Sequence, residues 1–208
     1  MSFHPQMRYS EGFQQSERKL PHAGEPFAFT EDRRREFERR AAQYPPEQRK
    51  SAILYALFLV QNQIGYVSAN AMRHVAEVIG CTPAEVEDVT SYYAMFFRQP
   101  TGKHVIQVCR TLSCALRGAE RVTEELTNAL GITVGGTDAT GTFTVVEAEC
   151  LGACDRAPVV MVNDRGWHEC LRPEDVPALL DGLRTRGETV LSGCIHNVEQ
   201  GSGPGAEG

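Results

Sequence analysis

Four cysteines in two tight pairs place the strongest constraint on how this chain can fold. Their spacings are C-x4-C and C-x3-C, with 35 residues between the pairs: Cys109, Cys114, Cys150 and Cys154. A strand is expected before each pair, at His104 to Val108 and at Thr142 to Ala148. Because the carboxyl ends of neighbouring parallel strands meet at one edge of a sheet, both loops would then face a single site. The sequence therefore predicts a fold that gathers four thiols.

Thiolate chemistry narrows what such a site can hold. Sulfur ligands select zinc, Cu(I) or iron–sulfur clusters, and four of them can hold a [2Fe-2S] cluster, two on each iron. Structural zinc sites more often use C-x2-C, so the wider loops suit a larger object than one ion. A helix that begins beside Cys114 would offer N–H groups to an anionic cluster, and Gly152 would let the backbone approach a sulfur without a Cβ. The spacing favours an iron–sulfur cluster and leaves zinc or thiol–disulfide chemistry open.

The remaining cysteines and the histidines carry no such pattern. Seven cysteines are an odd number in a chain of 208 residues, so a complete disulfide framework is not expected. Cys81, Cys170 and Cys194 are isolated, Cys170 being expected on a hairpin strand and Cys194 in a polar tail as an exposed thiol. His104 and His168 lie beside expected strands, where a structural role is expected.

Composition and charge exclude some classes of protein. Apolar residues make up 41% of the chain, enough to build a core, and the net charge of -6 disfavours binding to nucleic acid. The longest apolar run, Ala52 to Val60, is far shorter than the roughly 20 residues that span a bilayer, so no membrane insertion is expected. Met1 to Ser10 lacks the apolar stretch of a secretory signal. A cytoplasmic location is therefore expected.

The first half of the chain predicts a helical domain at residues 32–98. Thr82 is followed three residues later by Glu85, which is the form of a capping box. Residues 1–31 are polar without a clear period and are expected to form a flexible arm. Helices are expected, from apolar spacing and start and stop signals, at 51–64, 69–79 and 83–95.

The second half alternates between strands and helices, in the order β-α-β-β-α. This order predicts a small thioredoxin-like α/β domain at residues 101–186, so the whole chain is expected to be of the α+β class. The run from Asn163 to Gly166 suits a hairpin turn. Residues 187–208 are polar and glycine-rich and are expected to form a flexible tail. Besides the two strands already named, elements are expected at 116–130, 159–162, 167–170 and 173–184.

Four sequence segments resemble one known family. They resemble the thioredoxin-like [2Fe-2S] subunit of NADH:quinone oxidoreductase, respiratory complex I. The resemblance covers about residues 35–185, and its motifs are long and specific. The arm and the tail fall outside it. The segments, in chain order, are QIGYVS at 63–68, AEVEDVTSYYAMF at 84–96, CRTLSCALRGA at 109–119 and ECLGACDRAP at 149–158.

The resemblance implies an electron-transfer subunit of a larger respiratory complex, in its peripheral arm on the cytoplasmic side. A neighbouring flavoprotein subunit would hold FMN and oxidise NADH, and this chain would exchange single electrons with that flavin. The resemblance implies no NADH or quinone site on this chain. It implies these ligands for the cluster: Cys109, Cys114, Cys150 and Cys154.

Three alternatives remain open. The first is the equivalent diaphorase subunit of an NAD-dependent formate dehydrogenase or an NAD-reducing hydrogenase, which shares fold and ligands. The second is a scaffold subunit stabilised by zinc. The third, a dithiol oxidoreductase, is disfavoured because its C-x-x-C motif is absent.

Overall fold

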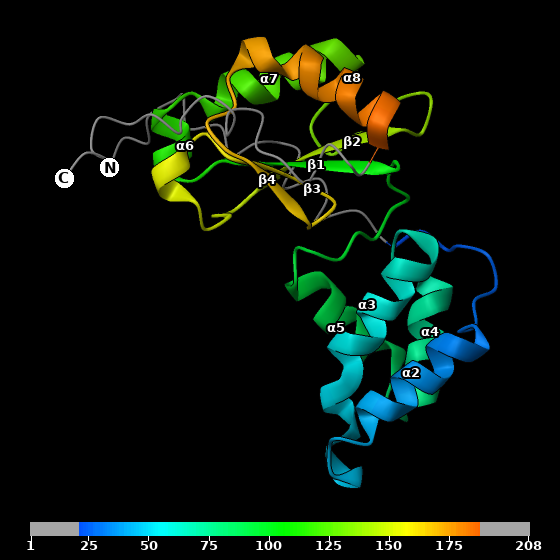
Figure 1. Ribbon diagram of the computed structural model, residues 1–208. Helices are drawn as coiled ribbons and strands as arrows, with labels where there is room; N and C mark the ends of the chain where they lie inside the picture. The colour runs from blue at the N-terminus through cyan, green and yellow to red at the C-terminus, as the bar shows by residue number, and fades with distance from the viewer. Residues whose placement is uncertain (1–20, 188–208) are drawn as a thin grey trace, which may run out of the picture. The chain divides into compact units, whose positions relative to one another are not determined.

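A computed structural model of the chain describes residues 21–187 (Figure 1). They divide between Thr101 and Gly102 into a helical unit and an α/β unit. The ends of the expected arm and tail, 1–20 and 188–208, lie outside the described residues, and so does Cys194. Within residues 21–187 no helix is long and apolar enough to cross a membrane.

The helical unit begins and ends its helices at residues that suit those positions. The predicted capping box is confirmed, because the Thr82 hydroxyl accepts from the backbone N–H of Glu85 while the Glu85 side chain accepts from that of Thr82. Gly65, with φ of 84°, closes one helix in the left-handed conformation that favours glycine. The elements are α2 (Glu31–Ala41), η1 (Pro46–Ala52), α3 (Ile53–Ile64), α4 (Ala69–Ile79) and α5 (Pro83–Tyr92).

The described part of the expected arm packs on this unit. Phe29 is only 9% exposed, stacks against Phe37 with ring centroids 6.0 Å apart, and donates its backbone N–H to Nε2 of His74. The Gln63 amide donates to the carbonyl of Ala28 at 2.9 Å. Residues 21–30 are thus held in place, because their aromatic side chains bury apolar surface that an irregular polar segment would lack.

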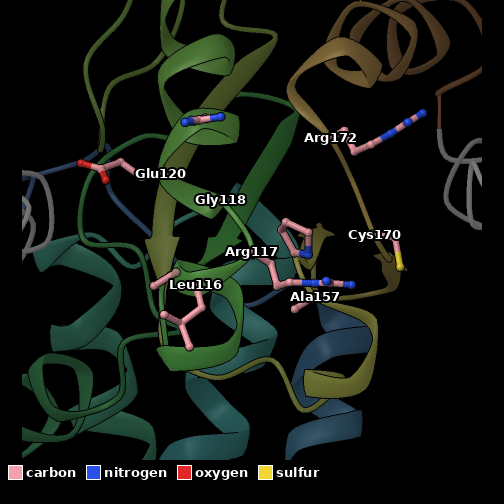
Figure 2. A pocket seen from close by; sticks show the side chains of 10 residues that line it. Leu116, Arg117, Gly118, Glu120, Ala157, Cys170 and Arg172 are labelled. Carbon is pink, nitrogen blue, oxygen red and sulfur yellow. The ribbon is translucent and has the colours of Figure 1, made fainter.

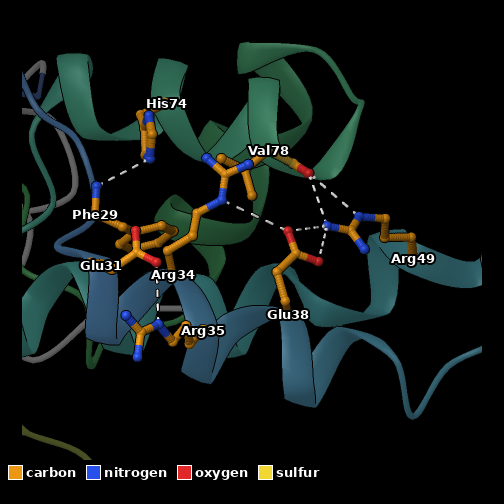
Figure 3. A network of polar contacts seen from close by, with 8 residues as sticks. All are labelled: Phe29, Glu31, Arg34, Arg35, Glu38, Arg49, His74 and Val78. Carbon is orange, nitrogen blue, oxygen red and sulfur yellow. Dashed lines mark hydrogen bonds and ion pairs between the residues drawn. The ribbon is translucent and has the colours of Figure 1, made fainter.

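Charged side chains link three elements of the same unit (Figure 3). Nη2 of Arg49, in η1, donates to both carboxylate oxygens of Glu38, in α2, at 2.9 and 2.8 Å. The same guanidinium donates to the carbonyl of Val78, in the last turn of α4, at 3.2 Å. A guanidinium at this end of a helix satisfies a carbonyl that has no partner within the helix. The contact therefore ties η1 to both α2 and α4.

The burial of Phe37 in the core of the helical unit predicts how far its substitution lowers the free energy of unfolding. Phe37 is fully buried, so Phe37→Ala should lower the free energy of unfolding by about 3–5 kcal/mol through lost burial and a residual cavity. Phe58 is 41% exposed, and Phe58→Ala should cost considerably less. Denaturant unfolding followed by the helical circular dichroism signal measures both. Equal costs for the two substitutions would contradict this packing.

The α/β unit contains a four-stranded mixed sheet in the order β2-β1-β3-β4. β1 runs parallel to β2 and antiparallel to β3, and β4 completes a hairpin with β3. Helices α7 and α8 lie together over the sheet (Figure 1). The elements are β1 (His104–Cys109), α6 (Leu112–Leu116), α7 (Ala119–Leu130), β2 (Phe143–Ala148), η2 (Cys154–Arg156), β3 (Val160–Val162), β4 (Gly166–His168), η3 (Pro173–Asp175) and α8 (Val176–Arg186).

The expected β-α-β-β-α order and α+β class are confirmed, with two local differences. The helix expected at 116–130 begins only at Ala119, because Gly118 adopts φ of 90° and separates it from the short helix α6, which ends at Leu116. The strand expected at 167–170 ends at His168, because Cys170 adopts a left-handed φ of 52°. The predicted hairpin turn is present, and Asn163 fixes it by accepting from the backbone N–H of Val105 at 2.8 Å.

Candidate metal centre

The two cysteine loops begin at the same edge of the sheet. Cys109 is the last residue of β1, and it pairs in parallel register with Ala148, the last residue of β2. Cys150 follows two residues later. The expectation that parallel neighbours would bring both loops to one site is therefore confirmed.

The first loop holds its two thiols inside the protein. Cys109 and Cys114 are each 1% exposed and belong to the core of the α/β unit. Cys114 lies in the five-residue helix α6, for which Thr111 is the N-cap. The Thr111 hydroxyl oxygen is 3.2 Å from the Cys109 sulfur. This loop therefore supplies two sulfurs that are shielded from water.

The second loop holds its thiols at the surface. Cys150 and Cys154 are exposed, and their sulfurs are 3.4 Å apart. The backbone N–H of Gly152 donates to the Cys150 sulfur at 3.4 Å. Gly152 has φ of 85°, and a Cβ there would meet no atom within 4 Å. The expected approach of the Gly152 backbone to a sulfur is confirmed, but the left-handed conformation, rather than the missing Cβ, is what requires glycine there.

Hydrogen bonds and burial together set the pKa values of the first pair of cysteines when no cluster is bound. Burial would raise the pKa of Cys109, but the Thr111 hydroxyl and the backbone N–H groups of Thr111 and Leu151 outweigh it and lower that pKa. Burial raises the pKa of Cys114 to about 11, and the neighbouring Cys109 sulfur adds to the effect. Cys109 is therefore the readier thiolate of the two.

The second pair shows the same asymmetry. The backbone N–H of Gly152 lowers the pKa of Cys150, whereas the hydrogen bonding and charge of Cys150 raise the pKa of Cys154. Cys109, from the other loop, also raises the pKa of Cys154. The charge of a thiolate in the first loop therefore acts on a thiol in the second.

The donor set fits a two-iron cluster. The sulfurs come as two pairs, one from each loop, which matches two thiolates on each iron of a [2Fe-2S] cluster. Thiolates are also the soft ligands that iron–sulfur clusters select.

Two residues beside the loops gave no clear signal in the sequence. Thr111 stands inside the C-x4-C loop, where a hydroxyl next to a ligand could have been noticed. Trp167 is far along the chain on β4, yet its indole N–H donates to the carbonyl of Leu151 at 2.8 Å. Only the tertiary structure brings Trp167 to the second loop.

Cys81 and Cys170, the isolated cysteines within residues 21–187, do not join the four thiols into a larger set. The expectation that Cys170 lies on a hairpin strand is wrong. Cys170 lies in the turn after β4 and lines a cavity of about 650 Å³ (Figure 2). Arg117 and Arg172 also line this cavity, but their side chains lie apart and do not converge (Figure 2). Cys81 belongs to the helical unit.

The two histidines are buried, as expected for structural residues. His104 and His168 are 1% and 0% exposed, and they lie on β1 and β4. Burial lowers the pKa of His168 below its usual value. His168 is therefore a neutral core side chain at pH 7.

The fold and the paired thiols define a thioredoxin-like ferredoxin. Residues 37–184 match the family described as thioredoxin-like [2Fe-2S] ferredoxin, and the chain belongs to this family. As a member of this family the chain carries a [2Fe-2S] cluster.

Similar proteins include subunits of NADH-quinone oxidoreductases. The chain is 42% identical over 176 residues to NADH-quinone oxidoreductase subunit 2 of Thermus thermophilus, covering 83% of this chain and 97% of the relative. It is 39% identical over 155 residues to a subunit of the NADH-quinone oxidoreductase of Pseudomonas aeruginosa, covering 74% and 92%.

Among solved structures, a NAD+-reducing [NiFe]-hydrogenase shares the fold. The TM-score is 0.56 at 22% identity, over 64% of this chain. The chain spans 23% of the length of that hydrogenase chain.

The asymmetry of the thiols predicts an order of reaction in the cluster-free chain. Only the thiolate is nucleophilic, so under native conditions Cys150, exposed and with a lowered pKa, should be alkylated by iodoacetamide first. Cys114, buried and with a pKa of about 11, should react last. Mass spectrometry of peptides from timed samples measures the order. Equal rates at both positions would contradict the geometry.

Proposed function

We propose that this chain is the electron-transfer subunit of an NADH-quinone oxidoreductase, respiratory complex I. Its [2Fe-2S] cluster exchanges single electrons with the FMN of a neighbouring subunit that oxidises NADH. The observation that carries the proposal is the meeting of two cysteine pairs at the ends of β1 and β2. The cluster ligands are these four residues: Cys109, Cys114, Cys150 and Cys154.

The chain's own residues shape the environment of the cluster. When bound, a [2Fe-2S] cluster accepts and returns one electron. Cys109 and Cys114 would supply two ligands from within the core, away from water. Cys150 and Cys154 would supply the other two at the surface, where a donor or acceptor can come within reach. The chain thus shields one pair of proposed ligands and leaves the other pair accessible.

Apolar side chains around the loops support a protein partner. Leu112 and Leu116, on the helix that carries Cys114, are 75% and 78% exposed, and Trp167 is 47% exposed. Exposed apolar groups gathered beside a site suit a surface that another subunit covers. In the helical unit Tyr92 is 80% exposed and supplies a further contact for the flavoprotein.

As a subunit of such a complex, the chain lies in its peripheral arm, on the cytoplasmic side.

A flavin on the partner is needed for chemical reasons. NADH gives up a hydride, which carries two electrons, and a [2Fe-2S] cluster takes one. A flavin can take up both electrons of the hydride and pass them on one at a time. In residues 21–187 the connection from β1 to α6 contains no glycine, and β2 leads to the short η2 rather than to a long helix, so neither forms a dinucleotide-binding turn. This chain therefore receives electrons from a cofactor held elsewhere.

The diaphorase of a NAD-reducing hydrogenase or of a formate dehydrogenase is the alternative setting. The hydrogenase likeness concerns the fold alone, while the relatives at 42% and 39% identity carry the name NADH-quinone oxidoreductase. Affinity purification under mild conditions separates the settings, because the subunits that accompany the chain differ. A zinc-stabilised scaffold is separated by colour, since an iron–sulfur protein is red-brown.

Substitution of the ligands tests the site. Replacing any one of the four proposed ligands by Ala should reduce bound iron to near zero after anaerobic purification, because a cluster missing one thiolate is lost. Iron analysis and the visible absorption spectrum measure the effect.

Two cysteines serve as matched controls. Cys81→Ser and Cys170→Ser should retain the iron content of the unmodified chain, since neither belongs to the two loops. A folded but colourless Cys170→Ser protein would show that the ligand assignment is wrong.

The need for a flavin on the partner subunit predicts the NADH-oxidising activity of the isolated chain. The chain alone, with its cluster reconstituted, should not sustain turnover of NADH with an artificial electron acceptor. Turnover should begin when the FMN-containing partner is added. The rate of NADH oxidation, followed optically, measures this. Sustained turnover by the chain alone would refute the proposed role.

A further inference from the structure

Trp167 connects the β3–β4 hairpin to the second cysteine loop. Its backbone pairs with Met161 across the hairpin, and its indole N–H donates to the carbonyl of Leu151 at 2.8 Å. Leu151 stands directly after Cys150 and packs against the core of the α/β unit. A side chain from a separate element therefore holds the backbone of the loop.

The Leu151 carbonyl shares its peptide plane with the backbone N–H of Gly152. That N–H donates to the Cys150 sulfur at 3.4 Å. One peptide unit thus has its carbonyl held by Trp167 and its N–H directed at a proposed ligand sulfur. If the carbonyl were released, this peptide plane could rotate, and the N–H would no longer be held toward that sulfur.

Hydrogen bonds to ligand sulfurs matter to an iron–sulfur site. They stabilise negative charge on the thiolates, and the reduced cluster carries one more negative charge than the oxidised cluster. Donors near the sulfurs therefore favour reduction and raise the reduction potential.

We propose that Trp167 is a positioning residue of the cluster site, which holds the Leu151 carbonyl so that the N–H of the same peptide unit, that of Gly152, faces the Cys150 sulfur. The proposal rests on the ligand assignment made above and deepens it. Trp167 acts through the loop. It is 47% exposed, so the hydrogen bond, rather than buried area alone, is the contribution that the geometry singles out.

The test is Trp167→Phe in the full-length chain with its cluster reconstituted. Phenylalanine keeps an aromatic ring on β4 and removes the N–H donor. The midpoint potential, from a redox titration followed by electron paramagnetic resonance, should shift to a lower value. Iron should be lost to a chelator roughly tenfold faster, as found when outer partners of metal ligands are removed.

Tyr44→Phe is the matched control. Like Trp167→Phe it keeps an aromatic ring and removes a side-chain donor from an exposed residue, 41% accessible, but in the helical unit, which contains neither cysteine loop. Its midpoint potential should equal that of the unmodified chain. A Trp167→Phe protein with the potential and the iron loss of the unmodified chain would overturn the proposal. Absence of iron in the unmodified chain would instead refute the ligand assignment.

The unmodified chain offers a second measurement that needs no folded variant. Trp167 is its single tryptophan, so fluorescence reports this position alone. Iron–sulfur clusters absorb where tryptophan emits, and the emission should fall in proportion to the iron bound during reconstitution. Emission that stays constant as iron binds would show that Trp167 is not held beside the site, and would overturn the proposal.

Discussion

The parallel pairing of β1 with β2 is the contact on which the candidate site depends. Backbone hydrogen bonds set the register in which Cys109 lies opposite Ala148, and this register fixes where both loops start. A shift of one residue would turn the alternate side chains of the strand to the opposite face of the sheet. Fully buried β1 side chains oppose such a shift. The core of the α/β unit therefore also specifies the positions of the four thiols.

The two loops differ in a way that suits electron transfer. The first is buried against the sheet, and the second is exposed, so the site has an inner side that excludes water and an outer side that a partner can approach. In each pair, hydrogen bonds favour one thiolate, at Cys109 and at Cys150. Donors that stabilise negative sulfur in the cluster-free chain remain available to a bound anionic cluster.

Local sequence signals predicted much of this fold, because they act through neighbouring residues. The capping box at Thr82 and the helix end at Gly65 depend on contacts within a few residues, and both occur where expected. The break at Gly118 was missed because the apolar period continues across it, and a glycine inside a helical pattern does not reveal its φ. The packing of Phe29 on Phe37 was missed because isolated aromatic residues in a polar segment have no period.

Only part of the candidate site could likewise be predicted from the sequence. The meeting of the cysteine pairs could be predicted from two strands and two spacings. The burial of Cys114, the exposure of Cys154 and the contact of Trp167 with the second loop depend on tertiary packing, so spacing alone could not give them.

The central claim is that the two loops together hold one [2Fe-2S] cluster. Metal and acid-labile sulfide analysis of the chain purified without oxygen, combined with electron paramagnetic resonance before and after reduction, tests it most directly. The account predicts two irons and two sulfides per chain, with a signal that appears only on reduction. Stoichiometric zinc without iron in the same preparation would contradict it.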